Sequence, residues 1–324
     1  TTSYDALDRL ITQVDPTPGG QTGFGYDDRD NLTTVTDPRG NTTTYTYNAF
    51  DEVVSQVSPD TGTTSFNYDA AGNLLGQTDA RGVTTTYRYD ALNRLTDIYY
   101  PDASLDVAFD YDQGANGIGR LTQMVDAAGT TDYTYDQRGN LVRETRTAGS
   151  LVTVTEFAYD ATDQLVTLTY PSGHQVHYGY DLQGRLISAT LERSDGSTQV
   201  LADNIAHLPF GPVESLTYGN GLQLTRSYDL DYRLTDQDIP GILHAAYTFD
   251  PVDNITAWRD VLDGSRDQLF GYDPLDRLDS ADGPYGVLGY AYDAVGNRLS
   301  LSTDGVSEDY VYATDSNRLT AITG

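Results

Sequence analysis

The sequence predicts an all-β protein in which about fifteen β-hairpins form one long, curled antiparallel sheet around a hollow. Three observations predict it: an aromatic residue recurs at intervals mostly of 20 to 24 residues, each interval holds two turn signals, and helical spacing of apolar residues is almost absent. A fixed period of this size is typical of repeat proteins, whose units bury apolar surface only against their neighbours. We therefore expect a single domain over residues 1–324.

The recurring aromatic residue, usually Tyr followed by Asp, is the anchor of each repeat. An aliphatic residue follows six positions later, as Leu74 follows Tyr68, or seven positions later in Leu299 and Leu319. A second aromatic residue usually precedes the anchor by two positions, on the same strand face, so aromatic pairs should stack in ladders. We expect Tyr68, Tyr89, Tyr135 and Tyr292 to be largely buried, with hydrogen-bonded hydroxyls. The anchors are Tyr4, Tyr26, Tyr47, Tyr68, Tyr89, Tyr111, Tyr135, Tyr159, Tyr180, Phe210, Tyr228, Phe249, Tyr272, Tyr292 and Tyr312.

Two turns flank the strands of each repeat. After Tyr68 the first is Asp-Ala-Ala-Gly-Asn and the second is Thr-Asp-Ala-Arg-Gly, and Asp, Asn and Gly supply side-chain caps and positive φ in such turns. Between them lie short runs of Thr, Tyr, Val and Leu that alternate with polar residues, as strands require. The turn glycines expected at positive φ are Gly40, Gly72, Gly82, Gly139, Gly184 and Gly296.

The repeat is degenerate over about residues 188–223. One anchor interval stretches to 30 residues there and the next shrinks to 18. We expect a longer excursion in this region, with one helical turn at Ala202–Ala206.

Fifteen hairpins give about 30 strands, which at about 4.8 Å per strand form a sheet about 144 Å wide. Open twisted sheets rarely exceed about ten strands without curling. Closed into one loop, this width corresponds to a diameter of about 46 Å by the same spacing, too wide for side chains to fill. The arithmetic thus predicts a hollow cocoon, groove or tube.

The composition of the chain excludes several classes of partner and site. The net charge is −29 and the pI about 4.1, so nucleic acid and anionic membranes would be repelled. There is no Cys, which excludes disulfides and thiolate metal sites. No apolar run of 18 residues occurs, so we expect no membrane insertion. The chain begins and ends in repeat phase, as expected of a piece of a longer polypeptide or of a sheet whose ends another molecule covers.

The repeats resemble the YD repeats of Rhs proteins. The resemblance rests on YDAAGNL at Tyr68, YDALNRL at Tyr89, YDQRGNL at Tyr135, YDLQGRL at Tyr180 and YDAVGNRL at Tyr292, and it covers essentially the whole chain. Relatives include shell components of insecticidal toxin complexes, bacterial polymorphic toxins and the extracellular part of teneurins. The resemblance implies a sheet that spirals into a hollow shell, often around a cargo toxin, or a rigid cell-surface body.

One feature of that family is missing. Its shell proteins carry a core segment with a self-cleaving, aspartyl-protease-like motif, and nothing here matches it. The nearest string, Asp37-Pro38-Arg39-Gly40, occupies an ordinary inter-strand turn, equivalent to the one at Asp79. We therefore expect neither autoproteolysis nor toxin activity in this chain, and no separate core, protease or toxin domain.

Catalytic and cofactor signals are weak, and we expect no enzyme, no cofactor and no metal site. His174 and His177 point to opposite faces of a strand, which suits a metal poorly. Calcium in turn clusters such as Asp27, Asp28 and Asp30 is the alternative to solvated turns. Exposed Tyr rows could stack on carbohydrate, although a Tyr in every repeat is more economically a packing residue. Sequons at Asn31, Asn41 and Asn254 are read as incidental.

Three function classes survive. The first is a non-catalytic extracellular shell segment that encapsulates or presents a cargo polypeptide. The second is a cell-surface filament or adhesin whose copies join end to end through open sheet edges, with carbohydrate as a partner. The third is a polysaccharide-acting enzyme, for which the sequence selects no carboxylate pair. We expect the first, outside a bacterial cell, with acidic turns along both rims and any self-association joining the region of Tyr4 to that of Leu319.

Overall fold

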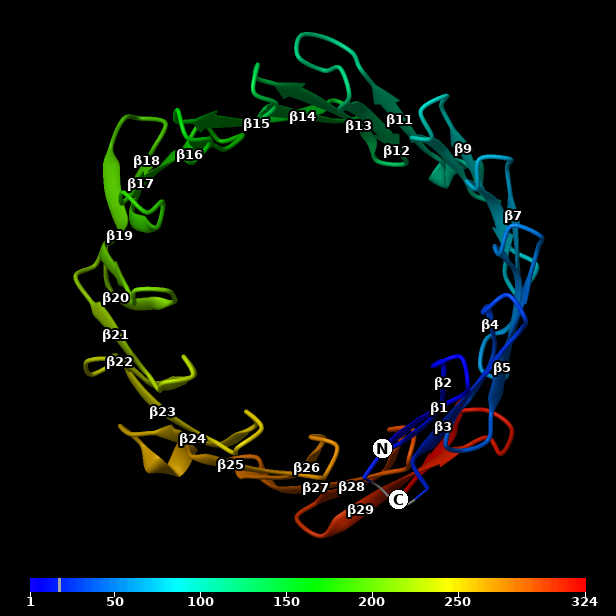
Figure 1. Ribbon diagram of the computed structural model, residues 1–324. Coiled ribbons are helices and arrows are strands. Elements are labelled where there is room, and N and C mark those ends of the chain that lie inside the picture. The colour runs from blue at the N-terminus through cyan, green and yellow to red at the C-terminus, as the bar shows by residue number, and fades with distance from the viewer. Residues whose placement is uncertain (17–18) are drawn as a thin grey trace. The chain divides into compact units, whose positions relative to one another are not determined.

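The computed structural model describes residues 1–16 and 19–324, and these form one sheet of 30 antiparallel strands (Figure 1). Pairing follows the sequence, each strand bonding to the strand before it and the strand after it. The predicted all-β array of hairpins is confirmed. Within the described residues, no helix is long and apolar enough to cross a membrane.

The strands have these bounds: β1 Thr2–Tyr4, β2 Leu10–Val14, β3 Gln21–Tyr26, β4 Leu32–Thr36, β5 Thr42–Tyr47, β6 Val53–Ser58, β7 Gly62–Tyr68, β8 Leu74–Thr78, β9 Thr84–Tyr89, β10 Leu95–Tyr99, β11 Val107–Tyr111, β12 Leu121–Asp126, β13 Gly129–Tyr135, β14 Leu141–Ala148, β15 Leu151–Tyr159, β16 Leu165–Thr169, β17 Gln175–Tyr180, β18 Leu186–Glu192, β19 Thr198–His207, β20 Val213–Tyr218, β21 Gln223–Tyr228, β22 Leu234–Ile239, β23 Leu243–Phe249, β24 Ile255–Asp260, β25 Gln268–Tyr272, β26 Leu278–Gly283, β27 Gly286–Tyr292, β28 Arg298–Thr303, β29 Val306–Tyr312 and β30 Leu319–Thr323. Two short 3-10 turns, η1 Ala103–Leu105 and η2 Gly264–Arg266, lie between strands.

In most repeats the anchor ends a strand, and the aliphatic residue begins the next. Tyr68 pairs with Leu74 across the turn, whereas its neighbour Asn67 pairs with Gly76, so Leu75 is left over as a β-bulge. The same register shift recurs before most anchors, for example at Tyr26, Tyr135 and Tyr292. Because a bulge bends the strand and increases its twist, its repetition adds twist to the sheet hairpin by hairpin.

The sheet has little buried core. Among the described residues, the buried apolar side chains are Val176, Ile205, Leu224, Ala245, Ala257 and Ala281. In β9 the half-buried Tyr87 and Tyr89 alternate with exposed residues, which places the aromatic pair on one face. The four anchors that the sequence predicts as largely buried are instead half-buried: Tyr68, Tyr89, Tyr135 and Tyr292. Tyr4, in the first strand, is 56% exposed. A hairpin array covers these rings chiefly with neighbouring hairpins, so part of each ring stays exposed.

The degenerate repeat contains strand where a helical turn was expected. Residues Ala202–Ala206 lie within β19, with register shifts between Asp203 and Ala206 and between Ala206 and His207. The extra residues are therefore absorbed as bulges, which keep the ladder intact on either side.

Two assignments of repeat positions are corrected as well. His207, and not Phe210, takes the anchor place: it pairs with Val213, and Phe210 is 94% exposed in the turn. Likewise Arg298, and not Leu299, pairs with Tyr292. Both errors arose because residue type was considered before strand register. The imidazole N–H of His207 takes the place of a Tyr hydroxyl, and the aliphatic stem of Arg298 takes the place of a Leu side chain.

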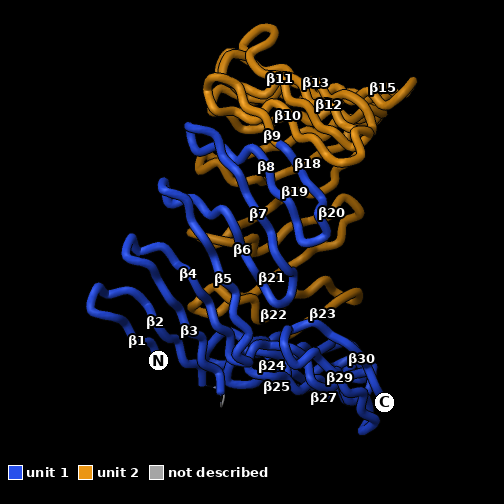
Figure 2. The backbone as a smooth tube through the Cα atoms, turned by 90° about the vertical axis from the view of Figure 1, so that its right-hand side faces the viewer, with its two compact units in different colours: residues 1–86, 247–324 blue, residues 87–246 orange. Residues whose placement is uncertain are grey.

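The described chain separates into two compact units (Figure 2). Unit 1 comprises residues 1–86 and 247–324, and unit 2 comprises residues 87–246. Unit 1 thus brings together the first and the last hairpins of the sequence, and the site described below lies within it.

Candidate functional site

The anchor hydroxyls link each hairpin to the one before it. Tyr135 donates its hydroxyl proton to the carbonyl oxygen of Leu121 at 2.7 Å, and Tyr68 does the same to Val53 at 2.9 Å. His207 Nε2 lies 2.8 Å from the oxygen of Leu186, in the same relation. Comparable bonds at 2.7 to 3.1 Å start from Tyr26, Tyr47, Tyr111, Tyr159, Tyr180, Tyr228, Tyr272, Tyr292 and Tyr312.

The Asp after each anchor caps its own turn. Asp69 Oδ1 accepts the backbone N–H groups of Ala71 and Asn73 at 2.8 and 2.9 Å, and its Oδ2 accepts the Asn73 side-chain amide at 2.9 Å. These bonds, led by that of the Asn73 side chain, hold the pKa of Asp69 below its usual value. The Asp of the YD motif is therefore a turn-forming residue.

The fourth residue after the anchor adopts left-handed backbone geometry. The glycines named above have φ of 86° (Gly40), 84° (Gly72), 77° (Gly82), 94° (Gly139), 80° (Gly184) and 92° (Gly296). Gly40 and Gly82 hold the equivalent place in the second kind of turn, three residues after Asp37 and Asp79. Asp and Asn tolerate this geometry better than other non-glycine residues, and Asp51 and Asn93 replace the glycine elsewhere.

Where Asp stands at that place, it also ties neighbouring turns together. Asn31 donates to Asp27 in its own turn at 3.1 Å and to Asp51 in the next turn at 2.7 Å. Equivalent pairs are Asn140 with Asp163 and Asn254 with Asp276. Two of the three carboxylates considered for calcium have such partners: Asp27 accepts from Asn31, and Asp30 pairs with Arg9, while Asp28 is exposed.

The last repeat departs from this pattern. Ala313 stands where most repeats have the capping Asp, so its turn has no carboxylate of its own at that position. Instead Arg39, from the turn between β4 and β5, donates Nη2 to the carbonyl oxygen of Ala313 at 2.8 Å. Its Nη1 donates to the carbonyl oxygen of Ser316 at 2.9 Å. Ser316 is 1% exposed.

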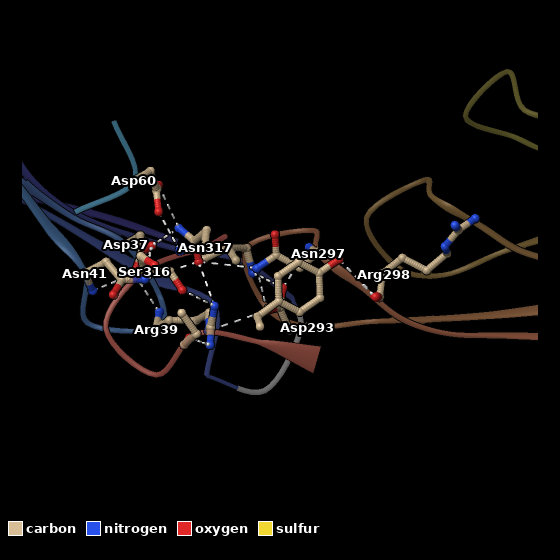
Figure 3. A network of polar contacts seen from close by, with 12 residues as sticks. Asp37, Arg39, Asn41, Asp60, Asp293, Asn297, Arg298, Ser316 and Asn317 are labelled. Carbon is tan, nitrogen blue, oxygen red and sulfur yellow. Dashed lines mark hydrogen bonds and ion pairs between the residues drawn. The ribbon is translucent and has the colours of Figure 1, made fainter. Parts of the chain in front are cut away.

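Asn317 completes this contact, as Figure 3 shows. Its side-chain amide donates to Asp37 Oδ2 at 2.7 Å, and its backbone N–H donates to Asp60 Oδ1. Its Oδ1 accepts from Arg39 at 3.0 Å and from Asn41 at 3.2 Å. We call this set the clasp: Asp37, Arg39, Asn41 and Asp60 on one side, and Ala313, Ser316 and Asn317 on the other.

The electrostatics of the clasp favour an ionised Asp37 carboxylate. Burial raises the pKa of Asp37, but hydrogen bonds from Asn317, Asn41 and the Arg39 backbone outweigh it and keep that pKa below the usual value. Arg39 Nε lies 3.7 Å from Asp293 Oδ2, and the Arg39 side chain is 24% exposed. Each charged group of the clasp therefore has partners, as partly buried charges require.

The equivalent turn two repeats later shows what is special about Arg39. Arg81 occupies the same position but folds back on Asp79, with Nη2 to Oδ2 at 2.7 Å, and is 79% exposed. The turn sequence alone does not distinguish the two arginines. The signal that sequence reasoning missed is Ala313, which stands in place of the capping Asp and leaves the last turn without a carboxylate acceptor there; Asp60 supplies one by accepting the Asn317 N–H.

The histidines considered for metal binding have other partners. His177 lies between Thr167 Oγ1 at 3.2 Å and Glu192 Oε2 at 3.0 Å, and His174 Nδ1 accepts the Ser194 N–H at 3.1 Å. In residues 1–16 and 19–324 no three His, Asp or Glu side chains form a group that could hold a metal ion.

Comparison with known proteins identifies the repeat. The family model described as RHS Repeat matches residues 26–63, 68–105, 116–151 and 154–198. No curated protein matches the chain.

Solved structures share the fold. A crystal structure of TcdB2-TccC3 matches with a TM-score of 0.85 and 20% identity, over 98% of this chain and 20% of that one. TcdB2-TccC3-Cdc42 matches with the same values. The Tc holotoxin pore of Photorhabdus luminescens, carrying a TccC3 mutation, matches with a TM-score of 0.84 and 19% identity, over 98% of this chain and 19% of that one. The chain thus spans about a fifth of the solved chains that it matches. The matched segments show that the chain carries RHS repeats, as its Tyr-Asp motifs predict, and the solved structures show that it shares the fold of those chains.

Proposed function

We propose that the chain is a non-catalytic shell segment of the Rhs and toxin-complex type, which curls around a cargo polypeptide outside a bacterial cell. The observation that carries the proposal is the clasp. It joins hairpins more than 250 residues apart in sequence, since Arg39 and Ser316 are 277 positions apart. Such a bond between early and late hairpins of one array is what an enclosing sheet needs and an extended stalk does not.

The rest of the site supports a structural role. The Tyr hydroxyls are used between hairpins, and the carboxylates of the Tyr-Asp motifs cap turns. Titratable groups held by turn geometry in this way are suited to rigidity, whereas catalysis requires a group poised for proton transfer in a cleft.

Protection of a tethered polypeptide tests the proposal. The chain is fused at its C-terminus to an unstructured reporter with protease sites, and reporter cleavage is compared with that of free reporter. Encapsulation predicts slower cleavage in the fusion, and release of that protection when Arg39→Ala and Asn317→Ala open the clasp. The Arg81→Ala fusion, which alters the equivalent exposed turn, should protect as well as the parent. Cleavage as fast as that of free reporter in a folded fusion would reject a cargo role for this segment.

A filament subunit is the second candidate, favoured by one observation. All five residues of β30 are exposed, including the apolar Leu319 at 47% and Ile322 at 54%. An exposed apolar strand can template pairing with another chain. Electron micrographs of the purified chain that show fibres lengthening with concentration would favour this candidate over the shell.

A further inference from the structure

The anchor rings attract guanidinium groups. In several repeats the fifth residue after one anchor is Arg, and its guanidinium carbon lies over the ring of the next anchor. Arg94 lies 4.4 Å from the ring centre of Tyr111, and Arg277 lies 4.7 Å from that of Tyr292. Arg9 has the same relation to Tyr26 at 4.9 Å. The ring face carries negative quadrupole potential, so a cation is favoured there.

A distant arginine can take the same position. The residue five after Tyr292 is Asn297, which carries no charge, and the next anchor is Tyr312. Here Arg39 of the clasp lies 5.9 Å from the ring centre of Tyr312. At Tyr312, where the local residue is neutral, a distant arginine thus supplies the cation at the anchor face.

At Tyr272, the residue five positions after the preceding anchor is also neutral, and a pocket lies beside the Tyr272 side chain. Asn254 stands in the arginine position and donates its amide to Asp250 and Asp276. A cavity of about 480 Å³ opens there, and four of its seven lining side chains are aromatic: Tyr247, Trp258, Phe270 and Tyr272. None of the seven is basic.

Trp258 makes this repeat different from the others. It stands three residues after the aliphatic Ile255, a position that holds Gln77, Glu144 and Gln237 in other repeats. It is the only Trp of the chain. Trp gives the strongest cation–π attraction of the aromatic residues, and here it joins three further rings around one space.

We propose that this aromatic pocket binds an organic cation of the quaternary ammonium class. Such a group is apolar enough to leave water for a cavity lined by rings, and its charge is stabilised by their faces. The chain's net charge of −29 raises the local concentration of any cation. The group could arrive on a free molecule such as choline or on a trimethylated lysine of a protein, and the chemistry of recognition is the same.

The single tryptophan provides the measurement. Choline chloride is titrated into the purified chain at constant ionic strength, with Trp258 fluorescence as the signal. The matched probe is 3,3-dimethylbutan-1-ol, which has the shape of choline without its charge. We expect a saturable change with choline and binding of the neutral probe weaker by about tenfold. Equal binding of both probes, or no saturable change with choline, would overturn the proposal.

Two variants separate the pocket from general attraction to an acidic protein. Phe270→Leu removes one ring and should weaken choline binding by about fivefold or more. Phe66→Leu changes the equivalent residue two before Tyr68 and should leave binding unchanged. Circular dichroism checks that both fold, and Tyr247→Leu replaces Phe270→Leu if that variant does not. Equal effects of Phe270→Leu and Phe66→Leu would contradict the assignment.

A second pair of probes distinguishes the two sources. A tripeptide with trimethyllysine is compared with the same tripeptide containing unmodified lysine. Stronger binding of the trimethyllysine peptide than of choline would indicate a modified protein as the ligand, and weaker binding would indicate a free cation. Equal affinity for the trimethylated and unmodified peptides would contradict selection for the quaternary group.

Discussion

At the scale of residues, one hydrogen bond is repeated along the chain. The anchor hydroxyl reaches back to the carbonyl oxygen of the aliphatic residue one hairpin earlier, as from Tyr135 to Leu121. The anchor ring is only half-buried, so the bond contributes alongside a modest apolar term. This explains why His207 can serve as an anchor: it keeps the donor while losing ring area.

Tyr135→Phe tests the hydroxyl separately from the ring. The substitution leaves the ring in place but removes the donor to Leu121, so we expect a loss of about 0.5 to 1.5 kcal/mol in the free energy of unfolding. Urea denaturation monitored by circular dichroism measures the loss. The same change at Tyr4, which is 56% exposed, should have almost no effect. Equal stability of Tyr135→Phe and the parent would show that packing of the ring is sufficient.

Gly82→Ala tests the left-handed turn position. Gly82 has φ of 77°, and an added Cβ would meet nothing within 4 Å, so any cost is conformational. We expect a loss of about 1 to 2 kcal/mol for Ala and a smaller loss for Asn, which tolerates this geometry. Thermal unfolding of the two variants side by side checks the order. An Asn variant that is less stable than the Ala variant would contradict this explanation.

At the scale of elements, the turns do more than reverse the chain. Turns of the same kind use Asp caps and left-handed residues, and several bond to the next turn through Asn–Asp pairs. The turn at Asp37 has the same local design as the turn at Asp79, yet it holds the last hairpin through Arg39 and Asn317. Turns of the same local design thus serve two roles, decided by what lies opposite.

Arg39→Ala should loosen the last hairpin. The substitution removes donors to Ala313, Ser316 and Asn317 and leaves their partly buried oxygens without that partner, at a cost of about 2 to 3 kcal/mol. Amide hydrogen exchange should accelerate in β29 and β30, with little change at β14. Arg81→Ala is the control, since Arg81 is exposed and bonds only within its own turn in the contacts described here. Equal rates of amide exchange in β29 and β30 of the two variants would contradict the role of the clasp in holding the last hairpin.

At the scale of the whole molecule, the acidity of the chain follows from the design of its turns. Most carboxylates sit in turns, and many accept backbone N–H groups that lower their pKa. For Asp112, hydrogen bonds from Arg94 and then from the Gly119 N–H lower the pKa to about 2. The large negative charge is therefore a consequence of a fold with two turns in every repeat.

Acid should destabilise the fold in a defined window. A carboxyl whose pKa is lower in the folded chain binds a proton more readily when unfolded, so its stabilisation is complete above about pH 4. It is lost as pH falls toward about 2, the pKa of Asp112. Relief of charge repulsion acts the other way, but at 0.15 M salt distant charges are screened beyond about 8 Å. Thermal unfolding at pH 5, 4, 3 and 2 should show a falling midpoint; a constant or rising midpoint would contradict this.

Self-association remains a prediction at this scale. If copies join, the region of Tyr4 should pair with that of Leu319 by strand addition, because repulsion between acidic rims opposes side-by-side contact. Light scattering over a series of salt and calcium concentrations checks this, with association expected to strengthen as charge is screened. A monomer throughout the series would remove support from the filament candidate.

The sequence by itself determined the hairpin, its anchors and its turns, because these depend on contacts within one or two repeats. A Tyr-Asp pair, an aliphatic residue six positions on and a glycine between them specify local geometry wherever they occur. Register errors arose only where residue type misled, at Phe210 and Leu299, since bulges and pairing depend on both strands at once.

Only the tertiary structure decided the clasp and the aromatic pocket. Arg39 and Arg81 occupy equivalent turns, and nothing local distinguishes the one that reaches Asn317 from the one that folds back on Asp79. The pocket beside Trp258 likewise exists because side chains from β23, β24, β25 and β26 leave a space that no single repeat encloses. Periodicity describes what every repeat shares, whereas function in such an array depends on the few places where non-equivalent repeats meet.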